Sequence, residues 1–150
     1  MRVWRLCSKK HAAFDGEGAR LAGGRWNLPG TPVVYTSATL SLAVLELLVH
    51  VDVAMVPAEL VTVLADVPDA LRIEQVDIDR LPRGWHRYPA PEALAEIGTR
   101  WARELRTPIL SVPSAIVPHE RNYLLNPLHP DHRRVRVGRV ERFMLDPRIV

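Results

Sequence analysis

Three polar side chains in the first third of the chain could bind an anionic ligand and act on it. Arg25 lies in Gly23-Gly24-Arg25-Trp26-Asn27, where glycine lets the backbone approach a ligand closely. A guanidinium suits phosphate groups because its donors form a planar fork. Tyr35 follows in an apolar run, and Glu46 is the only formally charged residue of residues 37–50. A carboxylate with apolar neighbours must be paired, hydrogen-bonded or neutralised, which makes Glu46 a candidate site residue.

Two helices and one long loop are predicted to position these residues. We expect a strand over residues 33–36 and a helix over residues 38–50, capped by Ser37. Residues 8–32 are rich in glycine and lack periodicity, which predicts a long ordered loop of the kind that often carries function. A second helix opens at Pro91. Its apolar stripe consists of Leu94, Ile97, Trp101 and Leu105.

The remaining elements are short strands. Apolar or alternating patterns predict strands in residues 2–6, 60–64, 71–78, 109–112, 115–117 and 135–137. Gly138 is predicted to mark a bulge, after which residues 142–145 would pair back onto residues 135–137. The resulting fold class is α+β: a single domain over residues 1–150, with short, mostly antiparallel strands and two main helices.

Composition limits the possible classes of protein. A chain of 150 residues with 47% hydrophobic and 25% charged residues is typical of one globular domain. The net charge of +3 and the pI of about 9.5 favour anionic ligands without demonstrating nucleic-acid binding. The single Cys7 excludes an internal disulfide and a multi-cysteine metal site. Neither a membrane span nor a signal peptide is evident, so we expect a cytoplasmic protein.

Several long blocks of the sequence, in order, resemble the RES-domain family, which is named for an arginine, a glutamate and a serine. The blocks are Phe14–Arg20, Gly23–Asn27, Pro29–Ser37, Glu46 with Leu48–His50, Val112–Pro118, and Asn122–Pro127 with His129-Pro130. Because they span nearly the whole chain, the resemblance is far more specific than any short motif.

The resemblance implies a fold similar to that of ADP-ribosyltransferases and a bacterial toxin that consumes NAD. It places Arg25, Tyr35, Glu46 and Ser114 at the site. NAD would be cleaved at its nicotinamide–ribose bond by a glycohydrolase or a phosphorylase, with water or inorganic phosphate as acceptor. Transfer of ADP-ribose to a protein is the alternative. The implied partner is an Xre-type antitoxin in an oligomeric complex, and nucleic acid would be contacted only through that antitoxin.

The chemistry of the residues agrees with this implication. Cleavage of a nicotinamide–ribose bond passes through an oxocarbenium-like state, so negative charge near the ribose favours it. We expect Arg25 to anchor the diphosphate and Glu46 to face the ribose. Tyr35 would stack on nicotinamide, and Ser114 would orient the ribose or the amide.

Each of these residues also has a structural interpretation. Arg25 could bond to carbonyl groups, pair with Glu17, or form an ion pair with Glu46. Tyr35 could belong to the core, and Ser114 could be a turn hydroxyl.

Asparagines complete the candidate site. Asn27 and Asn126 are candidate NAD-binding residues. Asparagine before proline is typical of turns, so a structural role is favoured for Asn126 and, similarly, for Asn122.

Two other classes of site are weaker candidates. His119, His129 and His132 with Glu120 and Asp131 could ligate a metal, but no His-x-x-x-His helix motif or cysteine supports this, and no metal is expected. Nucleic acid could bind a basic row near the C-terminus. Its members are Arg133, Arg134, Arg136, Arg139, Arg142 and Arg148. A nuclease would also need an acid–base pair containing His86 or His119, which no spacing specifies.

Overall fold

A computed structural model describes residues 1–52 and 55–149. The strands are β1 (Arg2–Ser8), β2 (Val34–Ser37), β3 (Leu60–Asp66), β4 (Ile73–Gln75), β5 (Ile109–Pro113), β6 (Arg121–Leu125) and β7 (Arg136–Phe143). The α-helices are α1 (Glu17–Ala22), α2 (Leu40–His50) and α3 (Glu92–Arg103). Short 3-10 helices are η1 (Lys9–His11), η3 (Ile78–Arg80) and η4 (Pro130–Arg134).

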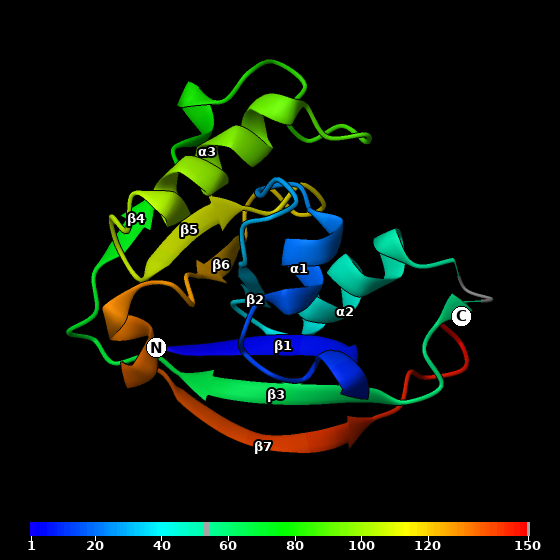
Figure 1. Cartoon of the computed structure of the whole chain (residues 1–150). Coiled ribbons are helices and arrows are strands. Elements are labelled where there is room, and N and C mark those ends of the chain that lie inside the picture. Colours follow the sequence, from blue (N-terminus) through cyan, green and yellow to red (C-terminus); the bar gives the residue numbers. More distant parts are fainter. Residues whose placement is uncertain (53–54, 150) are drawn as a thin grey trace.

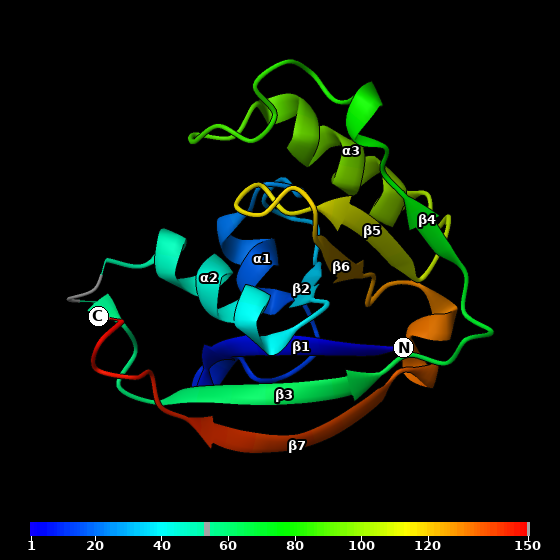
Figure 2. The same cartoon turned by 180° about the vertical axis from the view of Figure 1, so that it is seen from behind.

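The strands form one sheet in the order β4-β5-β6-β2-β1-β3-β7. Among the described strands, only β4 and β5 run parallel; the other neighbouring pairs are antiparallel. Figure 1 shows α3 lying over β4 and β5, whereas α1 and α2 lie beside β2 and β1. The reverse view in Figure 2 shows β7 at the free edge of the sheet. The predicted α+β class with mostly antiparallel strands is confirmed.

Both faces of the sheet centre are covered by apolar side chains. Successive residues of a strand point to opposite faces, so Leu110 and Ile109 of β5 enter different cores. The first core joins Leu110 and Leu124 to Trp101 of α3 and to Trp26. The second joins Ile109 to strand residues from β1, β2, β3 and β6. Tyr35 packs against the first core, so the site residues of β2 lie on the face that α3 covers.

The loop after α1 is fastened to α3 by a close backbone approach. A Cβ added at Gly98 would overlap the carbonyl oxygen of Trp26, so only glycine fits this position of the helix. The Leu28 amide donates to Thr99 Oγ1 at 2.8 Å. Trp26 is buried as a result, and the preceding Arg25 takes a fixed position beside the sheet.

The predicted long loop over residues 8–32 contains a helix that the sequence did not reveal. α1 spans six residues, which is too short to show an apolar stripe. Gly16 precedes it with φ +69°, a conformation that suits glycine. The cap of α2 also differs from the prediction, because Thr39 accepts a hydrogen bond from the Leu42 amide. Ser37 is instead the last residue of β2.

The segment after β5 was predicted incorrectly. Residues 115–117 form a bend rather than a strand, and β6 follows in the centre of the sheet. The sequence did not predict β6, because its first residues are polar and only Leu124 and Leu125 are fully buried, so no alternating or continuous apolar pattern marks the strand. In α3, Leu94 and Trp101 are buried as predicted, but Leu105 lies beyond the helix with φ 51°.

The C-terminal segment forms one strand instead of a hairpin. β7 pairs with β3 along its length, so residues 142–145 do not fold back onto 135–137. The predicted bulge at Gly138 is confirmed by the register shift between Val63 and Ala65. Since Arg136 opposes Asp66 and Arg142 opposes Val61, these arginines lie on opposite faces, and the predicted single basic row does not form.

Among the described residues, no helix is long and apolar enough to cross a membrane.

The Gly98→Ala substitution tests the contact between α3 and the Trp26 loop. The added methyl group meets backbone, which has no room to yield, so we expect the free energy of unfolding to fall by about 3 kcal/mol. Urea unfolding followed by tryptophan fluorescence measures this change. Gly18→Ala is the control, because its Cβ would lie 3.7 Å from His11. Equal stability of the two variants would contradict the close approach.

His132 predicts a pH dependence of stability. Its Nε2 lies 2.9 Å from the carbonyl oxygen of Phe14, and its buried Nδ1 has no hydrogen-bond partner among the described residues. Burial lowers the pKa of His132 below its ordinary value of 6.5. The unfolded chain therefore binds a proton at His132 more tightly than the folded chain does. Neutral His132 contributes its full stability above pH 6.5, and this contribution is lost as the pH falls through the lowered pKa of the folded state.

Between pH 7.5 and 5.5 we expect the wild type to lose more thermal stability than the His132→Gln variant. The glutamine amide can still donate to Phe14 but does not titrate. Parallel melting curves for the two proteins across this range would refute the assignment.

Candidate functional site

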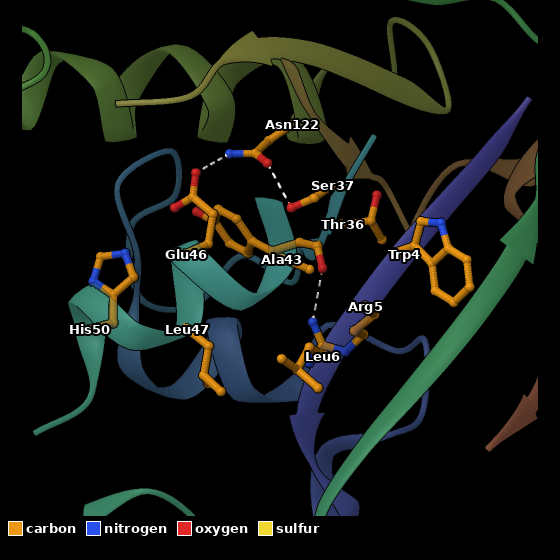
Figure 3. A pocket seen from close by; sticks show the side chains of 11 residues that line it. Trp4, Arg5, Leu6, Thr36, Ser37, Ala43, Glu46, Leu47, His50 and Asn122 are labelled. Carbon is orange, nitrogen blue, oxygen red and sulfur yellow. Dashed lines mark hydrogen bonds between the residues drawn. The ribbon is translucent and has the colours of Figure 1, made fainter. Parts of the chain in front are cut away.

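A cavity of about 770 Å³ opens between the Arg25 loop, β1, β2 and α2. Its size falls within the range of roughly 300–1,000 Å³ that is typical of small-molecule sites. Arg25, Tyr35 and Glu46 all line it, so the structure brings these three predicted residues together. A smaller pocket of about 210 Å³ adjoins it (Figure 3). The residues shared by both are Arg5, Leu6, Tyr35, Glu46, Leu47, His50 and Asn122.

Glu46 projects from α2 toward the beginning of β6. Its Oε1 accepts hydrogen bonds from Ser114 Oγ at 2.9 Å and from Asn122 Nδ2 at 2.5 Å. Among residues 1–52 and 55–149, none donates to Oε2. Figure 3 shows Asn122 between Glu46 and Ser37. One carboxylate oxygen is thus fixed by the protein and the other remains available to a ligand.

Ser114 is fully buried behind Glu46, directly after β5. Its hydroxyl donates to Glu46 and accepts from the amides of Ile116 and Val117, each at 3.1 Å. A hydroxyl has one donor and two acceptor positions, so all three are used. This geometry favours support of Glu46 over direct contact with a ligand.

Tyr35 and Asn27 form a buried network beneath the Arg25 loop. The Tyr35 hydroxyl donates to Asn27 Oδ1 at 2.7 Å and accepts from the Trp26 amide at 3.1 Å. Asn27 Nδ2 in turn donates to carbonyl oxygens of Ala19, Leu28 and Thr31. Burial raises the pKa of Tyr35, so the phenol stays protonated and keeps donating. Both side chains therefore hold the loop in place.

Arg25 combines a structural contact with free donors. Its Nη1 donates to the carbonyl oxygens of Trp85 at 2.8 Å and Arg87 at 3.1 Å. Within the described part of the chain, no ion pair joins Arg25 to Glu46, and Glu17 pairs with Arg20 instead. Burial lowers the pKa of Arg25, while the charge of Glu46 opposes that shift. The guanidinium thus faces the cavity with Nε and Nη2 unengaged by the described residues.

Arg5 is a cavity residue that sequence reasoning missed. Its guanidinium donates to the carbonyl oxygens of Tyr35 and His11 from the middle of β1. No carboxylate of the described residues pairs with it. The strand pattern identified β1 but gave no reason to expect that its arginine faces a ligand site.

Asn122 was also missed, because it was interpreted as a turn residue. It lies on β6 opposite Ser37 of β2, and its Oδ1 accepts from the Ser37 hydroxyl at 2.8 Å. His50, one helical turn after Glu46, lines the cavity as well. Because residues four apart lie on the same face of a helix, the spacing of Glu46 and His50 could have predicted that both face the same cavity.

Asn126 lies outside this group. It is fully buried, donates to the Ala102 carbonyl at 2.9 Å and accepts from the Leu128 amide at 3.0 Å. These bonds match the turn interpretation, and Asn126 lines neither pocket.

Two of the three histidines of the weaker metal hypothesis have other partners. His132 contacts Phe14, and His129 Nδ1 accepts from the Asp131 amide. In the part of the chain that the structure describes, no group of three potential ligands could hold a metal ion.

The Tyr35→Phe substitution tests the network beneath the loop. Removing the hydroxyl leaves the Trp26 amide and Asn27 Oδ1 buried without these partners. We expect the free energy of unfolding to fall by about 1–3 kcal/mol, measured by urea unfolding. Tyr88→Phe is the matched control, because the Tyr88 side chain is exposed. A Tyr35 variant as stable as this control would show that the hydroxyl does not support the loop.

Comparison with known proteins places the chain in a family. The RES domain family model matches residues 2–146. A protein of Sphingobium sp. named Prs ADP-ribosylating toxin is 37% identical, with 98% of this chain and 95% of the relative covered. A Toxin Res of Photorhabdus laumondii is 39% identical, with 100% of this chain and 97% of the relative covered.

A solved structure has the same fold. A chain in the crystal structure of the M. tuberculosis MbcT–MbcA toxin–antitoxin complex superimposes with a TM-score of 0.73 at 19% identity. The match covers 95% of this chain and 84% of that one. The family model and both relatives span nearly the whole sequence, so this chain belongs to the RES-domain family.

Proposed function

We propose that this protein is the toxin of a toxin–antitoxin pair and that it cleaves NAD at the nicotinamide–ribose bond. The observation that carries the proposal is the Glu46 carboxylate in the wall of the cavity. Two donors fix its Oε1, and its Oε2 is left for a ligand. The name of the Sphingobium relative, an ADP-ribosylating toxin, supports NAD as the substrate, and the name Toxin Res supports the role of a toxin.

The charges of the cavity suit a dinucleotide with a cationic leaving group. Arg5 and Arg25 supply two cations for the diphosphate, and Glu46 supplies a carboxylate. Oε2 can accept a hydrogen bond from a ribose hydroxyl and place negative charge near the anomeric carbon. A carboxylate held in position before reaction stabilises the developing oxocarbenium charge without reorganisation.

The bond between the anomeric carbon and the nicotinamide nitrogen breaks, and its electron pair neutralises the pyridinium ring. An acceptor oxygen then bonds to the anomeric carbon and loses its proton to solvent or to a carboxylate. Because nicotinamide leaves as a neutral molecule, no acid is needed to protonate it. Water, inorganic phosphate and a protein side chain are all chemically competent acceptors.

Transfer to a protein is the second candidate, and the name of the Sphingobium relative favours it. That acceptor has to approach the cavity from outside. Tyr88, an exposed side chain that also lines the cavity, lies on such a path.

An antitoxin would cover the apolar rim of the cavity. α2 is apolar around most of its circumference, yet Leu45 and Val49 are exposed, as are Leu21 of α1 and Tyr88. Tyr88 lines the cavity, and the other three residues lie on α1 and α2, the helices that contribute to its wall. Exposed apolar side chains on such elements are typical of protein interfaces. An antitoxin of the Xre type seated there would keep NAD out and would provide any DNA contact of the complex.

The experiment is NAD consumption by purified protein in phosphate and in phosphate-free buffer, with products separated by mass. Free ADP-ribose in both buffers indicates a glycohydrolase, and ADP-ribose phosphate in the first indicates a phosphorylase. Labelled protein in a bacterial lysate supplied with labelled NAD indicates a transferase. Absence of all three products would contradict the proposal.

The Glu46→Gln variant tests the role of the Glu46 carboxylate in cleavage. We expect kcat to fall by about 10²–10³-fold, the scale typical of losing one preorganised electrostatic contact. Glu92→Gln is the control, because Glu92 is exposed on α3 and does not line the cavity. Undiminished turnover by the Glu46 variant, with its fold intact, would remove Glu46 from the mechanism.

A further inference from the structure

We infer that Asn122 and Ser37 are positioning residues that set the orientation of the Glu46 carboxylate. This inference rests on the proposed function and assigns a role to two residues that lie outside the arginine, glutamate and serine of the family name. Ser37 would fix the Asn122 amide, and Asn122 would fix Oε1 of Glu46. Oε2 would thereby be kept facing the ribose.

The three side chains come from three different elements. Ser37 ends β2, Asn122 lies opposite it on β6, and Glu46 lies on α2. Ser37 Oγ donates to Asn122 Oδ1 at 2.8 Å, and Asn122 Nδ2 donates to Glu46 Oε1 at 2.5 Å. Figure 3 shows this chain of contacts in one view. The antiparallel β2–β6 register, rather than a loop, sets the distance between Ser37 and Asn122.

The direction of each hydrogen bond follows from the chemistry of the groups. An ionised carboxylate only accepts, so the Asn122 amide must present its nitrogen to Glu46. Its oxygen then faces Ser37, whose hydroxyl can donate. Rotation of the amide by 180° would place its oxygen against the carboxylate and lose the bond to Glu46, whereas the Ser37 hydroxyl could accept from the rotated amide nitrogen. Glu46 therefore selects the amide orientation, and the bond from Ser37 holds the amide in the position that supports Glu46.

Ser114 alone leaves the carboxylate free to turn. One donor to Oε1 fixes a distance but permits rotation about that contact. A second donor from a different direction, supplied by Asn122, restricts the rotation. Since small displacements of a reacting group can cost large factors in rate, loss of the second donor should affect turnover more than NAD binding.

Side-chain amide NMR tests the contacts without any substrate. The chain has three asparagines, Asn27, Asn122 and Asn126, and one glutamine, Gln75, so four amide pairs need assignment in the wild type and five in the Glu46→Gln variant. Glu46→Gln should shift the Asn122 pair strongly, because the amide loses a charged acceptor. Asn27 and Asn126 donate to carbonyl oxygens and should not move. An unchanged Asn122 pair would overturn the inference whatever the activity of the protein.

Kinetics test the role. We expect Asn122→Ala to lower kcat by about 10- to 100-fold with little change in KM. Ser37→Ala should lower kcat by about two- to tenfold, the range that corresponds to one neutral hydrogen bond. Ser41→Ala is the control on the exposed face of α2. A rise in KM for the Asn122 variant, with no effect of Ser37→Ala, would instead show that Asn122 contacts NAD directly and would overturn the inference.

The Asn122→Asp variant adds a pH readout and preserves shape. The protonated new carboxyl can donate to Oε1, whereas the ionised one repels Glu46. Its kcat should therefore be partly restored at acidic pH and should fall as the pH rises, unlike that of the wild type. A pH profile parallel to that of the wild type would contradict the inference. If the wild type consumes no NAD, the proposed function fails, and the NMR experiment still decides the contacts.

Discussion

The constraint on which the site depends is the need to keep a carboxylate half-buried among apolar side chains. Glu46 meets this constraint by accepting two hydrogen bonds on one oxygen, from Ser114 and Asn122. Removing a carboxylate from water costs free energy unless such partners replace the lost hydration. The same two bonds that make burial possible leave the second oxygen open to the cavity. Stability of the carboxylate and its availability to a ligand therefore have one origin.

The sheet supplies these partners from distant parts of the chain. β6 enters next to β2, so residues that are 76 positions apart in sequence, Glu46 and Asn122, come within hydrogen-bonding distance. Ser114 follows β5, which neighbours β6 in the sheet, and its hydroxyl contacts Glu46 from a different direction than Asn122 does. Meanwhile α3 holds the Trp26 loop at Gly98, and that loop carries Arg25. The cavity is thus assembled by strand order and by one close helix contact.

The electrostatic balance of the cavity follows from this assembly. Arg5 and Arg25 bond to carbonyl oxygens, which satisfy some of their donors without neutralising their charge. Glu46 is the acidic residue that lines the cavity with them. The cations can therefore meet a diphosphate while the carboxylate meets a ribose. A direct ion pair between Arg25 and Glu46 would have consumed both charges, and the described residues form none.

The sequence by itself determined the fold class, the two longer helices, the Gly138 bulge and the candidacy of Arg25, Tyr35 and Glu46. The local sequence pattern was sufficient for these features. An apolar stripe predicts a helix, a glycine permits a bulge, and a lone charge in an apolar run needs a partner, whatever the rest of the chain does. Tertiary structure alone decided that Asn122 joins Glu46, that Arg5 faces the cavity, and that Asn27 and Asn126 make buried hydrogen bonds to the backbone. Those roles depend on which strand lies next to which, and strand order is set by packing across the whole sheet, which no local stretch of sequence specifies.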